Sequence, residues 1–257
     1  MIENATYVYC LVAADRRPVL RRVPRGLPNT GAIRLVDVDR GLWLVVADAP
    51  LDRYGADAIN GKLSDLDWVS RLAVDHEAVI EAFINAKAVL PMKLFTLFST
   101  DQRAKDHIVR ERRRIDAVLK RVAKRVEWGV RVVLDKGMAL AKGGTATKPA
   151  SASTGISYLA HKKGQRDAAS ELAKRARTVV AELYDDLAKS AALARHRPAS
   201  EVPVQGAPLL LDAAFLVPQS KSSRFRILAD RHARALSSSG YRVTVSGPWP
   251  PYSFIQE

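Results

Sequence analysis

The chain of 257 residues has a single cysteine, Cys10, and no long run of apolar residues. A lone cysteine excludes an intrachain disulfide and any zinc site built on several cysteines. A membrane-spanning helix needs about 20 mainly apolar residues in succession, so no spanning segment is expected. The opening residues, Met1 to Thr6, lack the basic start and apolar run of a secretory signal. We therefore expect a cytoplasmic protein.

Recognisable catalytic motifs are also missing. No two of the five histidines have the spacing of a metal site, and no nucleophile, base and oxyanion set can be assembled. His76 and His232 fall on apolar helix faces and are predicted to be packed, hydrogen-bonded side chains, while Cys10 is predicted to lie buried in a strand. The sequence therefore predicts no enzymatic activity, no metal and no cofactor.

Positive charge, in contrast, is abundant. The net charge is +14, and between Arg103 and Arg125 ten Lys or Arg stand against three acidic residues, a surplus that supplies half of the total. Such a segment suits acidic partners or nucleic acid. Aromatic platforms for bases are missing there, and the acidic residues lie within helical pairing distance of the arginines. We favour a surface facing solvent or a protein partner, with nucleic-acid binding or regulation as the alternative; the candidate partner-binding residues are Arg110, Arg113, Arg114, Lys120 and Arg121.

Residues 1–126 are predicted to form an α+β domain. Thr6 to Val12 is a strand rich in β-branched and aromatic residues, and the runs 33–38 and 42–47 form a hairpin around Gly41. A capping box of Ser64 and Asp67 opens an amphipathic helix. A second helix, capped by Thr100 and continuing to Val126, carries the basic segment on its outer side.

Residues 127–257 are predicted to form a second domain with a ferredoxin-like α/β sandwich. The order is strand, helix, strand, strand, helix, strand. Residues 137–155 are rich in Gly, Ala, Thr, Ser and Lys and are expected to be a flexible loop. The elements after the strand that starts at Glu127 are a long helix from Tyr158 to about Arg195, strands at Glu201–Gln205 and Leu209–Val217, a helix capped at Ser222 or Ser223, and a strand at Tyr241–Ser246.

The end of the chain is the most distinctive segment. Three prolines and three aromatics occur within Gly247–Phe254. Proline has a fixed φ and no N–H, so these residues cannot continue a helix or a central strand. We predict a stiff, extended strap that packs on the second domain, to which the preceding strand belongs, and stabilises the fold. The alternative is that the segment is a ligand for a groove on a partner.

Taken together, the motifs resemble the gas vesicle protein F/L family (GvpF/GvpL). The most specific match is the ending, residues 247–254. Supporting matches occur along nearly the whole chain: Tyr7-Val8-Tyr9, His76-Glu77-Ala78-Val79, Val89-Leu90-Pro91-Met92-Lys93, Glu127-Trp128-Gly129-Val130, Tyr158-Leu159 and Ala213-Ala214-Phe215-Leu216-Val217. One departure is Phe95, which stands where the family commonly has glycine. The motif residues, expected to be structural, are Pro91, Trp128, Gly247, Pro248, Trp249, Pro250, Pro251, Tyr252 and Phe254.

The resemblance implies two α+β domains, no catalysis, and an accessory role in gas vesicle formation. It further implies binding to the small hydrophobic main shell protein and to other gas vesicle accessory proteins, in the cytoplasm and at the gas vesicle, and it leaves open whether the protein is a minor component of the mature vesicle. Our hypothesis is that domain 1–126 holds the shell subunit and that the basic helix attracts acidic partner surfaces.

Overall fold

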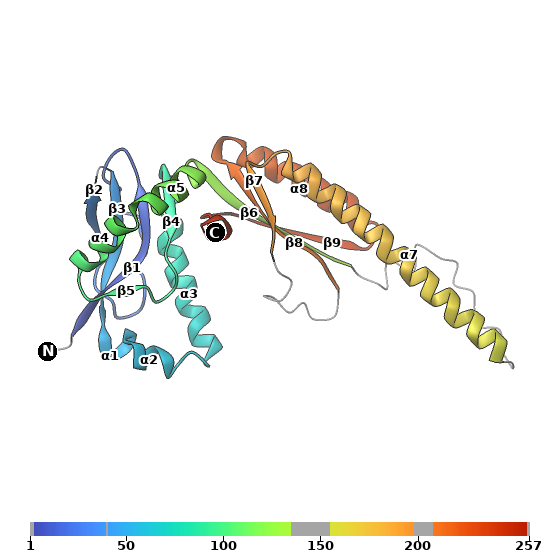
Figure 1. The fold of residues 1–257 in the computed structure, drawn as a ribbon, viewed down its shortest axis with the longest axis horizontal. Coiled ribbons are helices and arrows are strands. Elements are labelled where there is room, and N and C mark those ends of the chain that lie inside the picture. The colour runs from blue at the N-terminus through green and yellow to red at the C-terminus, as the bar shows by residue number, and fades with distance from the viewer. Residues whose placement is uncertain (1–2, 40, 135–154, 198–207, 256–257) are drawn as a thin grey trace. The chain divides into compact units, whose positions relative to one another are not determined.

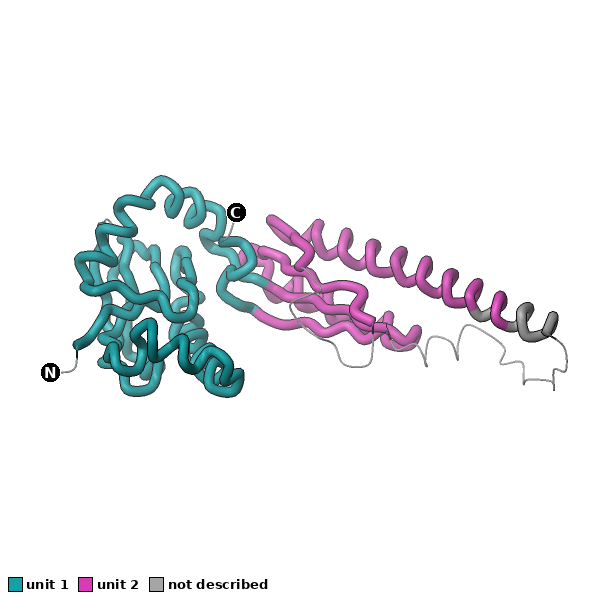
Figure 2. The backbone as a smooth tube through the Cα atoms, turned by 60° about the horizontal axis from the view of Figure 1, so that its bottom comes forward, with its two compact units in different colours: residues 1–127, 248–257 teal, residues 128–247 magenta. Residues whose placement is uncertain are grey.

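The computed structural model describes residues 3–39, 41–134, 155–197 and 208–255 of the chain. It divides into two compact units, shown in different colours in Figure 2. Unit 1 consists of residues 1–127 and 248–257, and unit 2 consists of residues 128–247. Each unit has its own sheet and helices (Figure 1), so the predicted α+β class is confirmed.

Unit 1 is built on a five-stranded sheet with the order β2-β3-β1-β4, and β5 pairs with β1 beside this path. The predicted hairpin is present as an antiparallel β2–β3 pair, with Gly41 at a φ of 85° in the turn. A positive φ of this kind favours glycine. The strands are β1 Asn4–Ala13, β2 Arg34–Asp39, β3 Leu42–Pro50, β4 Ala88–Pro91 and β5 Leu97–Phe98.

Helices cover both faces of this sheet, which explains why β1 is buried almost throughout. Successive side chains of a strand point to opposite faces. The Tyr7 hydroxyl bonds His76 of α3, whereas the Thr6 hydroxyl donates to Asp101 at the start of α4. The helices of unit 1 are α1 Leu51–Tyr54, α2 Ala56–Asn60, α3 Leu66–Glu81, α4 Asp101–Arg110 and α5 Arg112–Val122.

Two sequence-based predictions for these helices need correction. The N-cap of α3 is Asp65, whose carboxylate accepts from the Trp68 backbone N–H, and not Ser64. The basic helix begins at its predicted cap, Thr100, but breaks at Glu111, where φ is −87° and ψ is 10°. The break allows α4 to contact β1, β2 and β5 while α5 contacts β4. Val126 belongs to the next strand instead.

A buried polar chain links α3 to the segment after β4. The Phe95 backbone N–H donates to the Tyr7 hydroxyl at 3.3 Å, and the same hydroxyl lies 2.7 Å from His76 Nδ1. His76 Nε2 lies 3.0 Å from the Met92 carbonyl oxygen. A neutral ring protonated at Nε2 satisfies every partner, because Nδ1 then accepts and Nε2 donates. The predicted packed histidine is therefore confirmed for His76.

This geometry predicts a loss of stability at mildly acidic pH. Burial lowers the pKa of His76, opposed by its bond to the Met92 carbonyl. In the unfolded chain the pKa of the ring is about 6.5. Below that pH the unfolded state binds the additional proton, so His76 contributes full stability above about pH 6.5 and loses it as pH falls, by no more than about 1.4 kcal/mol per pH unit.

Denaturant unfolding between pH 7.5 and 5.5 checks this expectation, with the pH values taken as about one unit either side of the ordinary histidine pKa. His76→Gln is expected to be less stable at neutral pH and to show a flatter profile than the parent chain. His107→Gln, a change at an exposed ring, serves as the control and should keep the parent slope. A parent-like slope in His76→Gln would assign the pH dependence to other groups.

Unit 2 contains a four-stranded sheet with the order β7-β8-β6-β9. Its elements follow the ferredoxin-like succession β6-α7-β7-β8-α8-β9. The helices α7 and α8 contact each other and β8, so they cover one face of the sheet. The bounds are β6 Arg125–Leu134, α7 Gly155–Ala188, β7 Leu193–His196, β8 Leu209–Pro218, α8 Ser222–Ser237 and β9 Tyr241–Trp249.

The long helix is shorter than predicted at its C-terminal end. It stops at Ala188, and Leu193–His196 forms the edge strand β7, paired antiparallel with β8. This pairing across the sheet overrides the helical pattern of the sequence. The predicted strand Glu201–Gln205 and nearly all of the predicted loop 137–155 lie outside the described residues.

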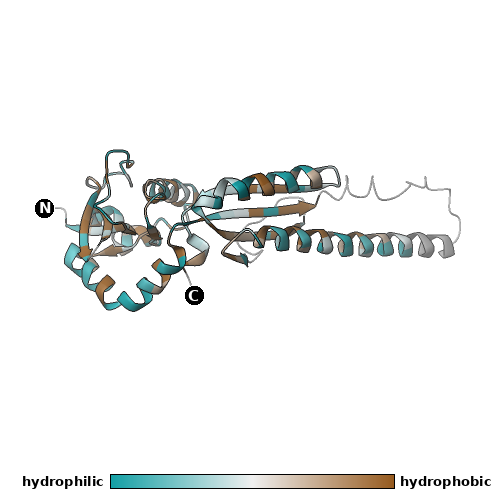
Figure 3. Ribbon diagram, turned by 90° about the horizontal axis from the view of Figure 1, so that it is seen from above, coloured by the Kyte–Doolittle hydropathy of each residue, from teal (hydrophilic) through white to brown (hydrophobic). Residues whose placement is uncertain are grey.

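Aromatic side chains form the core between the unit 2 sheet and the helices that cover it. Phe215 and Phe225 have ring centroids 5.4 Å apart, and Trp128 lies 6.0 Å from Phe225. The Trp128 indole N–H donates to Ser222 Oγ, so Ser222 does not act as the predicted side-chain cap of α8. Figure 3 shows the sheet strands as mainly hydrophobic and α7 as largely hydrophilic towards its N-terminal end. Among the described side chains of α7, the first half-buried one is Leu172 and the first buried one is Ala176.

The proline-rich ending groups with unit 1, which corrects the prediction that it packs on the second domain. Pro248 is accommodated because β9 is an edge strand, where a missing N–H is tolerated. Tyr252–Phe254 forms a 3₁₀ turn, not an extended strip. The buried Glu127 carboxylate accepts from the Ser253 backbone N–H at 2.7 Å and from its hydroxyl at 2.6 Å. This anchor is nonlocal and has no signature in the sequence pattern.

Candidate partner-binding site

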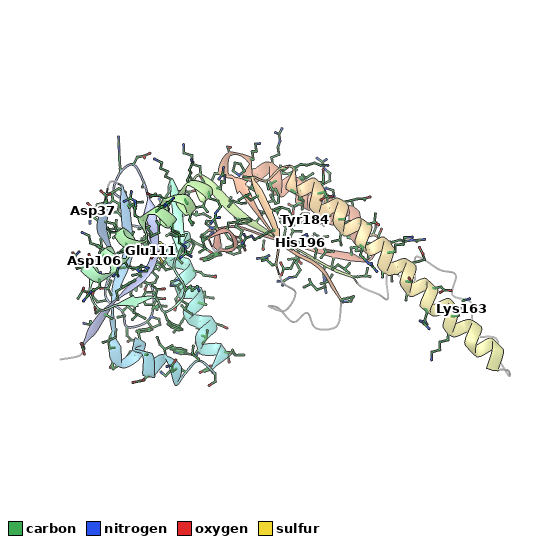
Figure 4. The ribbon with its side chains drawn as sticks, in the orientation of Figure 1. Asp37, Asp106, Glu111, Lys163, Tyr184 and His196 are labelled. Carbon is green, nitrogen blue, oxygen red and sulfur yellow. The ribbon has the colours of Figure 1, made fainter. Side chains whose placement is uncertain are left out.

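The basic segment lies on the outer side of α4 and α5, around the break at Glu111, which is labelled in Figure 4. The inner side of the two helices is apolar and buried. Because apolar positions recur every three or four residues, each helix presents one stripe to the sheet and leaves its charges outside. The inward positions are Ala104, Ile108, Ile115, Val118, Leu119 and Val122.

The structure separates the candidate basic residues into two groups. Arg110, Arg113 and Arg114 surround a shallow depression at the α4–α5 junction, together with Glu111 and Ala117. Arg114 reaches Glu111 only at 3.9 Å, a pair that is exposed and contributes little. The first two arginines have no ion pair within the described residues.

Lys120 and Arg121 lie two turns further along α5. Lys120 is exposed, whereas Arg121 is half-buried and its carbonyl oxygen accepts from Arg125. The neighbouring Arg112 is already neutralised, because it pairs with Asp39 at 2.9 Å and with Asp116 at 2.8 Å, and these carboxylates raise its pKa. Arg112 therefore adds little free charge to the surface beside the junction, where Arg110 and Arg113 are unpaired among the described residues.

Beside the junction lies an apolar groove with a volume of about 340 Å³, here called the junction groove. It is bounded by α4 and α5 on one side and by β4 with its following segment on the other. Polar side chains occur at its margin. The lining residues are Leu90, Pro91, Met92, Lys93, Thr96, His107, Ile108, Glu111, Arg114, Ile115, Val118 and Ile255.

Sequence reasoning identified the basic margin of this groove but not its floor. Ile108, Ile115 and Val118 fit the apolar period of the two helices, and Pro91 was predicted only to be a structural residue. Pro91 ends β4, pairs with Cys10 and lines the groove. No local pattern distinguishes an apolar stripe that is fully covered from one that leaves a groove.

Most of the remaining motif residues are buried or have a special backbone conformation, as expected for structural residues. Trp128 is buried in unit 2, and Gly247 adopts a φ of 124°, which side chains rarely tolerate. Within the ending, Phe254 is 2% exposed, whereas Trp249 is 38% exposed. Pro250 and Pro251 are buried, Tyr252 is half-buried and Pro248 is exposed.

Chemistry-bearing side chains elsewhere have packing partners. Cys10 is fully buried, and burial raises the pKa of its thiol, which makes it a poor nucleophile. His232 bonds Asp186 at 2.8 Å, and the Tyr184 and His196 rings stack at 4.2 Å (Figure 4). Within the described residues, no cluster of His, Cys, Asp and Glu could hold a metal ion.

None of the helices in the described part of the chain is both long and apolar enough to cross a membrane.

Comparison with known proteins gives a consistent result. The sequence model of the family described as "Gas vesicle synthesis protein GvpL/GvpF" matches residues 5–256. Gas vesicle protein L of Streptomyces sp. (strain CB03234) is 30% identical over 256 residues, which span 98% of this chain and 93% of that protein.

Two solved structures share the fold. The crystal structure of the gas vesicle protein GvpF from Anabaena sp. PCC7120 matches with a TM-score of 0.72 at 18% identity, covering 99% of this chain and 97% of that one. GvpF from Microcystis aeruginosa matches with a TM-score of 0.70 at 16% identity, covering 98% and 99%. Because the family model and the curated relative both span almost the whole sequence, this chain belongs to the GvpL/GvpF family of gas vesicle proteins.

Proposed function

We propose that this protein is a non-enzymatic accessory factor of gas vesicle formation that binds the hydrophobic main shell protein through unit 1 and assists its assembly. Family membership supports the gas vesicle role. The observation that carries the binding role is the apolar junction groove beside the exposed arginines Arg110, Arg113 and Arg114. The other expected partners are further gas vesicle accessory proteins.

The groove has the features of a helix-binding surface. A shell subunit that polymerises exposes apolar surface, which must be shielded before assembly. An amphipathic helix lays its apolar face into such a groove through anchors at i, i+3, i+4 and i+7. Met92 would contact those anchors, while Arg110, Arg113 and Arg114 at the adjacent junction would meet acidic residues of the same helix.

Binding of purified shell protein to the full chain tests the proposal. Met92→Asp places a charge in the groove, and Arg114→Glu reverses a margin charge while breaking only the weak 3.9 Å pair. Each is expected to weaken binding by about tenfold or more, equivalent to about 1.4 kcal/mol. Arg103→Glu is the matched control, because it makes the same charge change at an exposed position of α4 outside the groove lining.

The full chain is the appropriate reagent, since a fragment ending at Val126 would omit residues 248–257 of unit 1. Unaltered shell-protein affinity in both folded variants would reject the groove as the binding site. DNA and RNA are included over a range of salt concentrations, because a phosphate binder loses affinity steeply as salt rises. Nucleic-acid binding without shell-protein binding would favour the alternative function.

A further inference from the structure

A second cavity of unit 1, here called the α3 pocket, has a volume of about 290 Å³ and lies on the α3 side of the sheet. Its apolar floor consists of Tyr54, Trp68 and Leu72. Tyr54 and Leu72 are 4% and 3% exposed, so the floor is continuous with the core. The pocket and the junction groove share no lining residue.

Three cationic side chains converge on this floor from separate parts of the chain. Arg53 comes from α1, Lys62 from the turn after α2, and Arg71 from α3. None of the three forms an ion pair with a residue of the described ranges. Asp75 contributes the one carboxylate of the lining, so the pocket carries a net charge of +2.

The aromatic part of the floor is held in place. Trp68 stacks on Phe95 with ring centroids 5.7 Å apart and an interplanar angle of 16°. Lys62 Nζ lies 5.5 Å from the centre of the same indole ring. An aromatic side chain and a cation thus lie next to each other in the lining, an arrangement that favours a ligand with both a planar and an anionic part.

The segment that contributes Pro28 and Asn29 to the lining is also fixed by hydrogen bonds. The Tyr54 hydroxyl donates to the Pro28 carbonyl oxygen at 2.7 Å, and the Leu27 backbone N–H donates to the Tyr9 hydroxyl at 3.0 Å. The Thr30 hydroxyl donates to the Leu27 carbonyl oxygen at 2.7 Å. A wall that is ordered without ligand reduces the entropy lost on binding.

We propose that the α3 pocket binds a small phosphate monoester that carries a flat ring. A phosphate monoester has a charge of about −1.5 to −2 at neutral pH, which complements the net charge of the lining. The guanidinium forks of Arg53 and Arg71 match phosphate oxygens, and Lys62 adds a point charge. The volume is close to the lower end for ligand pockets, about 300 Å³, and suits a compound of mononucleotide size.

Calorimetric titration of the full chain with adenosine 5′-monophosphate tests this site. We expect one binding site per chain, with adenosine and inorganic phosphate each binding at least about tenfold more weakly, because each lacks one half of the recognised chemistry. Arg53→Gln and Arg71→Gln are each expected to weaken binding by about tenfold or more. Both positions are exposed, so the fold is retained, as thermal unfolding without ligand will verify.

Arg103→Gln is the matched control, because it removes an exposed arginine of α4 that lines neither the α3 pocket nor the junction groove, and it should leave the affinity unchanged. Equal weakening by Arg103→Gln and Arg71→Gln would show attraction to net charge alone. Inorganic phosphate binding as tightly as the nucleotide would show an adventitious ion only. Either result, or an absence of nucleotide binding, overturns the proposal without bearing on shell-protein binding at the junction groove.

Discussion

Replacing Glu127 with alanine is expected to destabilise unit 1 by about 2–4 kcal/mol and to detach the ending of the chain from it. The side chain is 3% exposed and accepts two hydrogen bonds from Ser253. A hydrogen bond to a charged group contributes about 1.5–3 kcal/mol, and the partners left unsatisfied add to the loss. Detachment would also uncover Phe254, which is buried.

Hydrogen exchange resolved by peptide measures this effect in the full chain, because a two-unit protein need not unfold in one step. Faster exchange is expected in residues 248–255 and in α3, with less change in unit 2. Ser253→Ala should lower the stability of unit 1 less than Glu127→Ala does, since the backbone N–H of residue 253 keeps its bond to Glu127. If residues 248–255 and α3 exchange at the same rates in Glu127→Ala and in the parent chain, the anchoring role is contradicted.

Tyr252→Phe provides a control in the same segment. The structure gives the buried Tyr252 hydroxyl no hydrogen-bond partner in the described part of the chain. Burial raises the pKa of this hydroxyl, with further contributions from Glu77 and Glu81. Removing a buried hydroxyl without a partner is expected to leave stability unchanged or to increase it. A loss like that of Glu127→Ala would show an undetected partner.

Local patterns were sufficient to predict most strands. The β-branched run at Thr6–Val12 and the hairpin around Gly41 were correct because β-propensity and turn chemistry are properties of neighbouring residues. The succession of elements in unit 2 was likewise predicted. The end of α7 was wrong because pairing of Leu193–His196 with β8 depends on a strand about 20 residues away.

Nonlocal contacts explain the larger errors. No glycine or proline marks the break at Glu111, so the apolar period continued through it in the sequence. The ending was assigned to the second domain because it directly follows a strand of that domain. Its attachment to unit 1 depends on a buried carboxylate at Glu127, and buried charged residues cannot be distinguished from exposed ones by pattern alone.

The candidate site was likewise predicted only in part. The basic residues of the α4–α5 segment were predicted from composition, and the structure brings three of them, Arg110, Arg113 and Arg114, together at the junction. The groove floor was missed because its apolar residues obey the same helical period as the core.

Phe95, the departure from the family pattern, has a φ of 66°, a conformation that favours glycine. Its ring stacks on Trp68, and this contact offsets part of the backbone strain. The sequence alone indicated an unusual residue at this position but not the contact that retains it.

Asp212→Ala is expected to destabilise unit 2 by about 3 kcal/mol, the lower end for breaking a buried ion pair. Asp212 lies on β8 and its side chain is 6% exposed. One carboxylate oxygen pairs with Arg131 at 2.7 Å and the other with Arg197 at 2.7 Å, joining three segments of the chain. Both arginines are about one-third exposed, and water therefore compensates part of the loss.

Asp230→Ala is the matched control for this change, because it removes an exposed carboxylate of α8 whose pair with Arg226 spans 3.7 Å. Its expected cost is about 0.5 kcal/mol or less. Asp212→Asn keeps the side-chain volume but directs an amide N–H₂ towards a guanidinium group, so it should resemble alanine more than the parent chain. Denaturant unfolding, with exchange measured in β6 and β8, ranks the three variants. If Asp212→Ala costs no more than Asp230→Ala, the two arginines are adequately solvated without their shared carboxylate, and these ion pairs do not stabilise unit 2.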